Sequence, residues 1–276
     1  GVVGEGGTGD GRGGEAVKRA LLFPGQGAQK VGMAVDLAEA FPEVAELFRL
    51  ADEVSGLPVS VVHNPESNMN NAVGVAQVDI TPELGHNLAG WIDVRPATRQ
   101  ASPIMARALA LAADRTQVVL IACDLVGIGA DVRVRVEEAV QAACGVPPHH
   151  LFILPSHNHY GPSVSGSYAS SAERTAQETA YTEALIASFT EAAATALGKL
   201  QPAHLSIGYT EETTYRRNSR FWRKDGTINW VGKRDVDFAS ESGPYDPQLG
   251  VLRIADEQDA TIATLYNVGC HANAAE

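Results

Sequence analysis

A continuous apolar run, TQVVLIACDLVGIG, constrains the fold of this chain more than any other feature. Residues 116–129 show no regular alternation of polar and apolar side chains, which is typical of a strand buried on both faces. Helical spacing follows over residues 131–143, ending near Gly145 and Pro147, and a second apolar run occupies residues 151–154. The order strand, helix, strand predicts a βαβ unit with two parallel strands.

Other segments predict further strands and a long helix. Alternation from Gly74 onward breaks at Pro82, and residues 105–112 form another apolar strand candidate. The Ala-, Glu- and Thr-rich residues 171–200 suit a helix. HLSIGYTEE predicts a strand, and the end of the chain predicts a hairpin around an Asp-Glu-Gln-Asp turn. We therefore expect an α/β fold with a mixed, partly parallel β-sheet flanked by helices.

Two stretches are expected to be irregular. The polar, aromatic segment YRRNSRFWRKDGTINWVGKRDVDFASESGPYDPQ predicts a long loop. Glycine supplies eight of the first fourteen residues, so residues 1–18 predict a flexible tail. Residues 19–60 predict a short helical N-terminal appendage, with a strand at 21–23, and residues 61–73 a polar linker.

Charge and cysteine content exclude several classes of function. The chain has 33 acidic and 21 basic residues and a formal net charge of -12, which disfavours a nucleic-acid surface. Cys123, Cys144 and Cys270 are too widely spaced for a disulfide framework or a CxxC zinc motif. No apolar run is long enough to predict a transmembrane segment. Small neutral or lipid-like substrates remain compatible with this composition.

The segment LFILPSHNHYGPSV carries the first candidate site. Residues two apart in an extended chain point the same way, so His157 and His159 are expected to face one cavity. His271 also follows an apolar strand. If both strands belong to one sheet and run the same way, their ends bring His157 and His271 together. Imidazole is a common zinc ligand, but on spacing alone a solvated loop or a hydrogen-bonded structural pair is the simpler explanation of His-x-His.

Four blocks in order resemble the amino-terminal domain of the neutral/alkaline non-lysosomal ceramidases. They are GVAQVDITPELGHNLAGW, ARALALAADRTQVVLIACDLVGIG, GVPPHHLFILPSHNHYGPS and GVLRIADEQDATIATLYNVGCHANA. The resemblance covers residues 74–276. It implies zinc (Zn²⁺) held by His157 and His271, with His159 as a catalytic residue beside the metal. It also implies hydrolysis of the amide of ceramide, a lipid-like substrate, to a fatty acid and sphingosine.

The same resemblance implies further site residues. Arg217 and Asn218 fall where the family has a polar, substrate-binding loop, although a solvated loop is an equal alternative. The family completes its zinc shell with a Glu and a Tyr from further along the chain, which predicts that this sequence is a fragment. Family members are commonly exported, but the first residues show no charged-then-apolar leader, so the compartment stays open.

A second resemblance covers only residues 19–56. LLFPGQGAQKVGMAVDLAEAFPEVAELFRLADEVSG is similar to the start of malonyl-CoA:acyl-carrier-protein transacylases, in which the position of Gln26 contributes to the oxyanion hole. The nucleophile motif GxSxG does not occur in the sequence. Without its serine, a transacylase cannot form the acyl-enzyme. The alternative functions are therefore a transacylase fragment or a folded relic without metal.

The remaining polar and aromatic candidates are expected to be structural. Asp79 and Asp124 at strand ends predict turn or hydrogen-bonding roles, and His86 is unpaired in the sequence. Trp91 and Trp222 suit either a lipid groove or ordinary loop packing.

Overall fold

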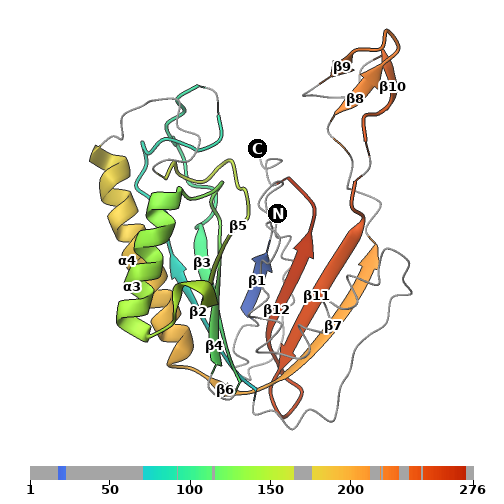
Figure 1. Cartoon of the computed structure of the whole chain (residues 1–276). Coiled ribbons are helices and arrows are strands. Elements are labelled where there is room, and N and C mark those ends of the chain that lie inside the picture. The colour runs from blue at the N-terminus through green and yellow to red at the C-terminus, as the bar shows by residue number, and fades with distance from the viewer. Residues whose placement is uncertain are drawn as a thin grey trace, which may run out of the picture.

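The computed structural model describes residues 18–22, 71–91, 93–113, 116–164, 176–211, 218, 220–229, 236–243 and 245–271. These residues form three layers (Figure 1): a pair of helices, a five-stranded sheet and a four-stranded sheet. The expected α/β class with a mixed sheet flanked by helices is confirmed. Neither helix in the described ranges has the length and apolarity needed to cross a membrane.

The five-stranded sheet has the order β5-β4-β3-β2-β6. Its β4 and β5 pair in parallel and are connected by α3, which confirms the predicted βαβ unit. The other pairs are antiparallel. The elements of these two layers are β2 (Ala72–Asp79), β3 (Met105–Ala113), β4 (Thr116–Cys123), α3 (Ala130–Cys144), the short 3-10 helix η2 (Pro148–His150), β5 (Leu151–Pro155), α4 (Ala176–Leu197) and β6 (Gln201–Pro202).

Burial on both faces explains why β3 and β4 are apolar along most of their length. In β3, Ala106, Ala108 and Ala110 belong to the core beneath the helices, whereas Leu109 and Leu111 belong to the core between the two sheets. Successive side chains of a strand point to opposite faces, so a strand between two cores needs apolar residues at consecutive positions.

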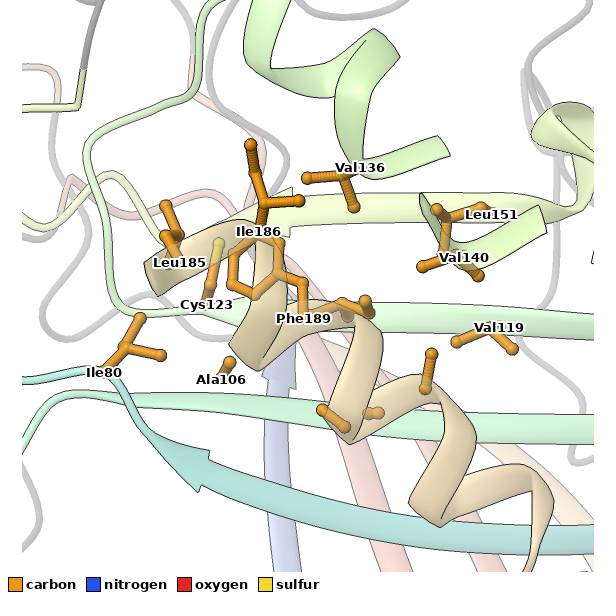
Figure 2. Close-up of a cluster of buried hydrophobic side chains, with 14 of the residues drawn as sticks. Ile80, Ala106, Val119, Cys123, Val136, Val140, Leu151, Leu185, Ile186 and Phe189 are labelled. Atoms are coloured by element: carbon orange, nitrogen blue, oxygen red, sulfur yellow. The ribbon is translucent and has the colours of Figure 1, made fainter. Parts of the chain in front are cut away.

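Phe189 of α4 is fully buried at the centre of the core beneath the helices. Figure 2 shows it over the sheet, beside Ile186 and close to Val136 of α3. Small residues on the facing strands allow α4 to approach closely. A side chain at Gly74 of β2 would place its Cβ 1.9 Å from the carbonyl oxygen of Ala196. The sequence VGV therefore uses glycine where helix and strand backbones nearly touch.

The four-stranded sheet covers the other face of the five-stranded sheet and has the order β1-β12-β11-β7 (Figure 1). The predicted terminal hairpin is confirmed by the antiparallel pairing of β11 with β12. Arg253 closes its turn by donating to the carboxylate and the carbonyl of Asp259. The strands are β1 (Lys18–Leu22), β7 (His204–Glu211), β11 (Gln248–Ala255) and β12 (Thr261–Val268).

One expectation about the fold is wrong. The segment predicted as a long loop contains a small antiparallel sheet of β8 (Phe221–Arg223), β9 (Ile228–Asn229) and β10 (Phe238–Glu241), which projects from the body (Figure 1). Phe221 is buried against Phe238, with ring centroids 5.4 Å apart. This cross-strand aromatic pair stabilises strands that are too short to show a clear alternation.

The amino-terminal expectations are only partly within the described residues. β1 spans Lys18–Leu22 and pairs in parallel with β12, whereas a strand at 21–23 was expected. β2 begins at Ala72, close to the expected boundary at Gly74. Residues 23–60 of the expected helical appendage and residues 61–70 of the expected linker lie outside the described residues, as do residues 171–175 of the predicted long helix.

Candidate metal centre

Three histidines from two distant segments meet at one end of the layered structure. The ring centroids of His157 and His159 lie 4.9 Å apart, and His271 lies 4.8 Å from the first and 4.7 Å from the second. Their ligand nitrogen atoms all lie within 4.8 Å of one another. We call these three residues the histidine triad. The triad can hold a metal ion.

The strands that deliver the triad belong to different sheets. His157 follows β5 of the five-stranded sheet, and His271 follows β12 of the four-stranded sheet. The condition that one sheet carries both histidines is not met, and the two side chains nevertheless lie side by side. The two histidines meet because the two sheets pack face to face, with the carboxyl ends of β5 and β12 at the same end of the structure.

His157 occupies a turn and not an extended chain. Its φ of 61° lies in the left-handed region, which residues other than glycine rarely adopt. The backbone is held on both sides, because Ser156 N–H donates to Cys123 O and Asn158 N–H donates to Leu125 O. The premise of an extended His-x-His was therefore wrong. The two imidazoles face each other because the chain turns sharply between two anchored residues.

Backbone carbonyl groups select the tautomer of two of the imidazoles. His157 Nδ1 lies 3.0 Å from Val126 O, and His159 Nδ1 lies 3.1 Å from Gly90 O. Since a carbonyl oxygen only accepts, each Nδ1 carries the proton and donates it. Each Nε2 is then unprotonated, the form in which a histidine nitrogen ligates a metal.

His159 and His271 approach each other through these remaining nitrogens, with their Nε2 atoms 2.8 Å apart. Burial first, and then the neighbouring imidazole of His157, lowers the pKa of His159. Burial and the two other imidazoles, that of His159 foremost, likewise lower the pKa of His271. The lowered pKa values favour the neutral form that a metal ligand or a general base requires.

The donor set fits zinc. Tetrahedral zinc with Zn–N bonds of about 2.0–2.1 Å separates its ligand nitrogens by about 3.3 Å. The ligand nitrogens of the triad span separations from 2.8 Å to at most 4.8 Å, so shifts of an ångström or so bring them to that spacing. Two of the three rings already have backbone acceptors behind them, which is the usual outer shell of a histidine ligand.

Other predicted site residues lie elsewhere or outside the described ranges. Arg217 and Gln26 lie outside them. Asn218 donates to Gly243 O and accepts from Arg220 N–H, so its described hydrogen bonds stay near the projecting sheet and do not reach the triad. Asp124 accepts from Met105 N–H and Arg107 at the end of β4, as expected for a structural carboxylate.

Sequence reasoning missed Gly90 and Val126 and undervalued Trp91. Trp91 donates its indole N–H to His159 O at 2.8 Å, and Gly90 has a φ of 78°. A lone glycine before a tryptophan is a weak signal for such a role. The contribution of Val126 is a carbonyl group, which every residue type has, so the sequence carries no signal for it.

Comparison with known proteins gives a fold relationship. No protein-family model matches the chain, and no curated sequence matches it. The crystal structure of neutral ceramidase from Pseudomonas aeruginosa superposes with a TM-score of 0.57 and 20% identity, covering 72% of this chain and 32% of the ceramidase. A ceramidase complexed with C2 superposes with a TM-score of 0.55 and 19% identity, covering 72% and 31%.

These matches agree with the resemblance seen in the sequence. The chain spans about a third of the length of either ceramidase. The transacylase alternative receives no support from the comparisons. The described residues thus have the fold of a segment of neutral ceramidase.

Proposed function

We propose that this chain contributes the metal centre of a zinc-dependent amide hydrolase of the neutral ceramidase type, which cleaves N-acylsphingosine to a fatty acid and sphingosine. The observation that carries the proposal is the histidine triad, assembled on a ceramidase-like fold. The ordered sequence blocks around His157 and His271 support the same assignment.

The three imidazoles take different roles in this proposal. His157 and His271 ligate zinc through Nε2. A zinc ion held there supplies Lewis-acid activation of the amide carbonyl and the attacking water. His157 suits a ligand because its ring is held by Val126 O behind it.

His159 handles the proton. Its Nδ1–H is engaged by Gly90 O, and its lowered pKa keeps Nε2 unprotonated, so Nε2 can accept a proton from the attacking water. As the water oxygen bonds to the carbonyl carbon and the C–N bond breaks, the same proton is delivered to the departing sphingosine nitrogen. One neutral imidazole thus serves as base and then as acid.

Metal analysis of single variants tests the assignment. We expect about one zinc per chain in the unmodified protein and a loss of zinc in His157→Ala and His271→Ala. His159→Ala is expected to keep its zinc and to lose hydrolysis of a fluorescent N-acylsphingosine by about 10²–10⁴-fold. The matched control is His149→Ala, because His149 is exposed on η2 outside the triad.

Each arm of this experiment has an overturning result. Zinc bound in equal amounts by the unmodified protein and by both ligand variants would refute the metal centre at the triad. Zinc-dependent cleavage of short soluble amides, with no cleavage of N-acylsphingosine, would refute the substrate. Loss of zinc from His159→Ala would make His159 a ligand instead of the proton carrier.

A further inference from the structure

A short segment, residues 86–91, runs antiparallel along the chain that follows His159. Ala89 N–H donates to Gly161 O at 3.0 Å, and Ser163 N–H donates to Asn87 O at 2.7 Å. A bridge joins Leu88 to Pro162 between these two bonds. The segment is therefore attached to the histidine loop along its length.

His86 anchors the far end of this attachment. Its ring is buried, and its Nε2 lies 3.0 Å from Ser163 O, to which it donates. The ring also packs against Tyr181 of α4, with centroids 4.9 Å apart. The segment is thus fastened to the core before it reaches His159.

At the near end, two consecutive residues hold His159 at two places. Gly90 O accepts from the imidazole Nδ1–H at 3.1 Å, and the indole N–H of Trp91 donates to the backbone carbonyl at 2.8 Å. Gly90 also provides space, because a Cβ at this position would lie 2.4 Å from His159 Nδ1. Its φ of 78° further restricts the position to glycine.

The indole is itself held in place. The guanidinium of Arg95 lies 3.9 Å from the centroid of the Trp91 ring, a cation–π contact. The rings of His159 and Tyr160 lie edge-on to the same indole. These contacts therefore restrict the orientation of the Trp91 indole, so that its N–H stays directed at the His159 carbonyl.

We propose that Gly90 and Trp91 form a clamp that positions His159, fixing its Nδ1–H tautomer and aiming its Nε2 at the other two histidines. A ring free to rotate about its χ angles would present the wrong nitrogen for part of the time. The contribution of the clamp to hydrolysis rests on the proposed function, whereas the positioning of the ring does not. Gly90 and Trp91 are positioning residues, since they act through His159.

Nitrogen NMR of the histidine rings tests the positioning without substrate. The ¹⁵N-labelled full chain is compared with Trp91→Phe, which keeps an aromatic ring but removes the indole donor, and with His159→Gln to assign the signal. We expect His159 to show the Nδ1–H tautomer with a slowly exchanging proton. In Trp91→Phe that proton is expected to exchange about fivefold faster, as loss of one net hydrogen bond implies.

Two further variants distinguish loss of the clamp from a general folding defect. Arg95→Gln alters an exposed side chain and is expected to change the His159 signal in the same direction by a smaller factor. Trp222→Phe, on the projecting sheet, is the matched control and is expected to leave the signal unchanged. An unchanged His159 signal in both Trp91→Phe and Arg95→Gln would overturn the clamp.

Kinetics separate the clamp from the proposed function. In the zinc-loaded protein, Trp91→Phe is expected to lower kcat about tenfold with unchanged KM and zinc content, since a displaced imidazole loses alignment and not substrate affinity. If the NMR change appears but the unmodified protein does not hydrolyse N-acylsphingosine, the proposed function fails and the clamp stands. If hydrolysis occurs and Trp91→Phe alters neither kcat nor the NMR signal, the clamp fails alone.

Discussion

The Nε2 atoms of His159 and His271 lie 2.8 Å apart, although 112 positions of sequence separate the two residues. With the Nδ1–H of His159 given to Gly90 O, the proton between the two rings belongs to His271 and is donated to His159. A cation bound to His271 Nε2 would replace that proton and leave His159 Nε2 as an acceptor. The contact therefore joins the segments that follow two different sheets, and it lies within the candidate metal centre.

This contact predicts a pH dependence of stability in the metal-free protein. The pKa values of His159 and His271 are lowered in the folded state, so the unfolded chain, with a value of about 6.5, binds these protons more readily. The stabilisation is complete above about pH 6.5 and is lost as the pH falls from there through the folded pKa values. Thermal unfolding between pH 7.5 and 5.5 is expected to show Tm falling, and falling less in His159→Gln. His149→Gln is the control, and an equal fall in His159→Gln would contradict the prediction.

The backbone at His157 predicts an unusual order of variant stabilities. Because its φ is 61°, glycine suits the position better than alanine. We expect His157→Gly to be more stable than His157→Ala by about 1–2 kcal/mol in urea unfolding of the metal-free protein. Both variants lose the bond to Val126 O and the metal ligand, so only the backbone term differs between them. Equal stabilities would show that the turn relaxes without its side chain.

The close contact between β2 and α4 predicts that one added methyl group destabilises the fold. In Gly74→Ala the new Cβ meets the Ala196 carbonyl, so strand and helix must separate. We expect the free energy of unfolding to fall by about 1–3 kcal/mol, measured by chemical denaturation. Gly208→Ala is the matched control, because no atom lies within 4 Å of its Cβ position on β7. Similar effects of the two substitutions would argue against the close approach.

The cysteines predict an order of reactivity toward a thiol reagent. Cys123 is 1% exposed, and burial, followed by the charge of Asp124, raises its pKa strongly. Cys270 is exposed beside His271. Mass spectrometry after brief maleimide treatment is expected to find Cys270 modified in the native protein and Cys123 modified only after unfolding. Early modification of Cys123 would indicate that the core under the helices opens readily.

The elements around the central sheet were predictable, because their patterns are local. The continuous apolar runs of β4 and β5, with α3 between them, require burial on two faces, and both faces are covered in the structure. The projecting sheet was not predictable in the same way. Its strands are too short for a period to emerge, and a tertiary contact between Phe221 and Phe238 holds them.

By itself, the sequence determined which segments must be buried and that His157, His159 and His271 each follow an apolar strand. Only the tertiary structure decided that β5 and β12 lie in separate sheets whose ends coincide, and that Gly90 O and Val126 O hold two of the rings. The physical reason is that hydrophobic periodicity reports the environment of a segment and not its neighbour. A backbone carbonyl is the same in every residue, so its role exists only once the chain has folded.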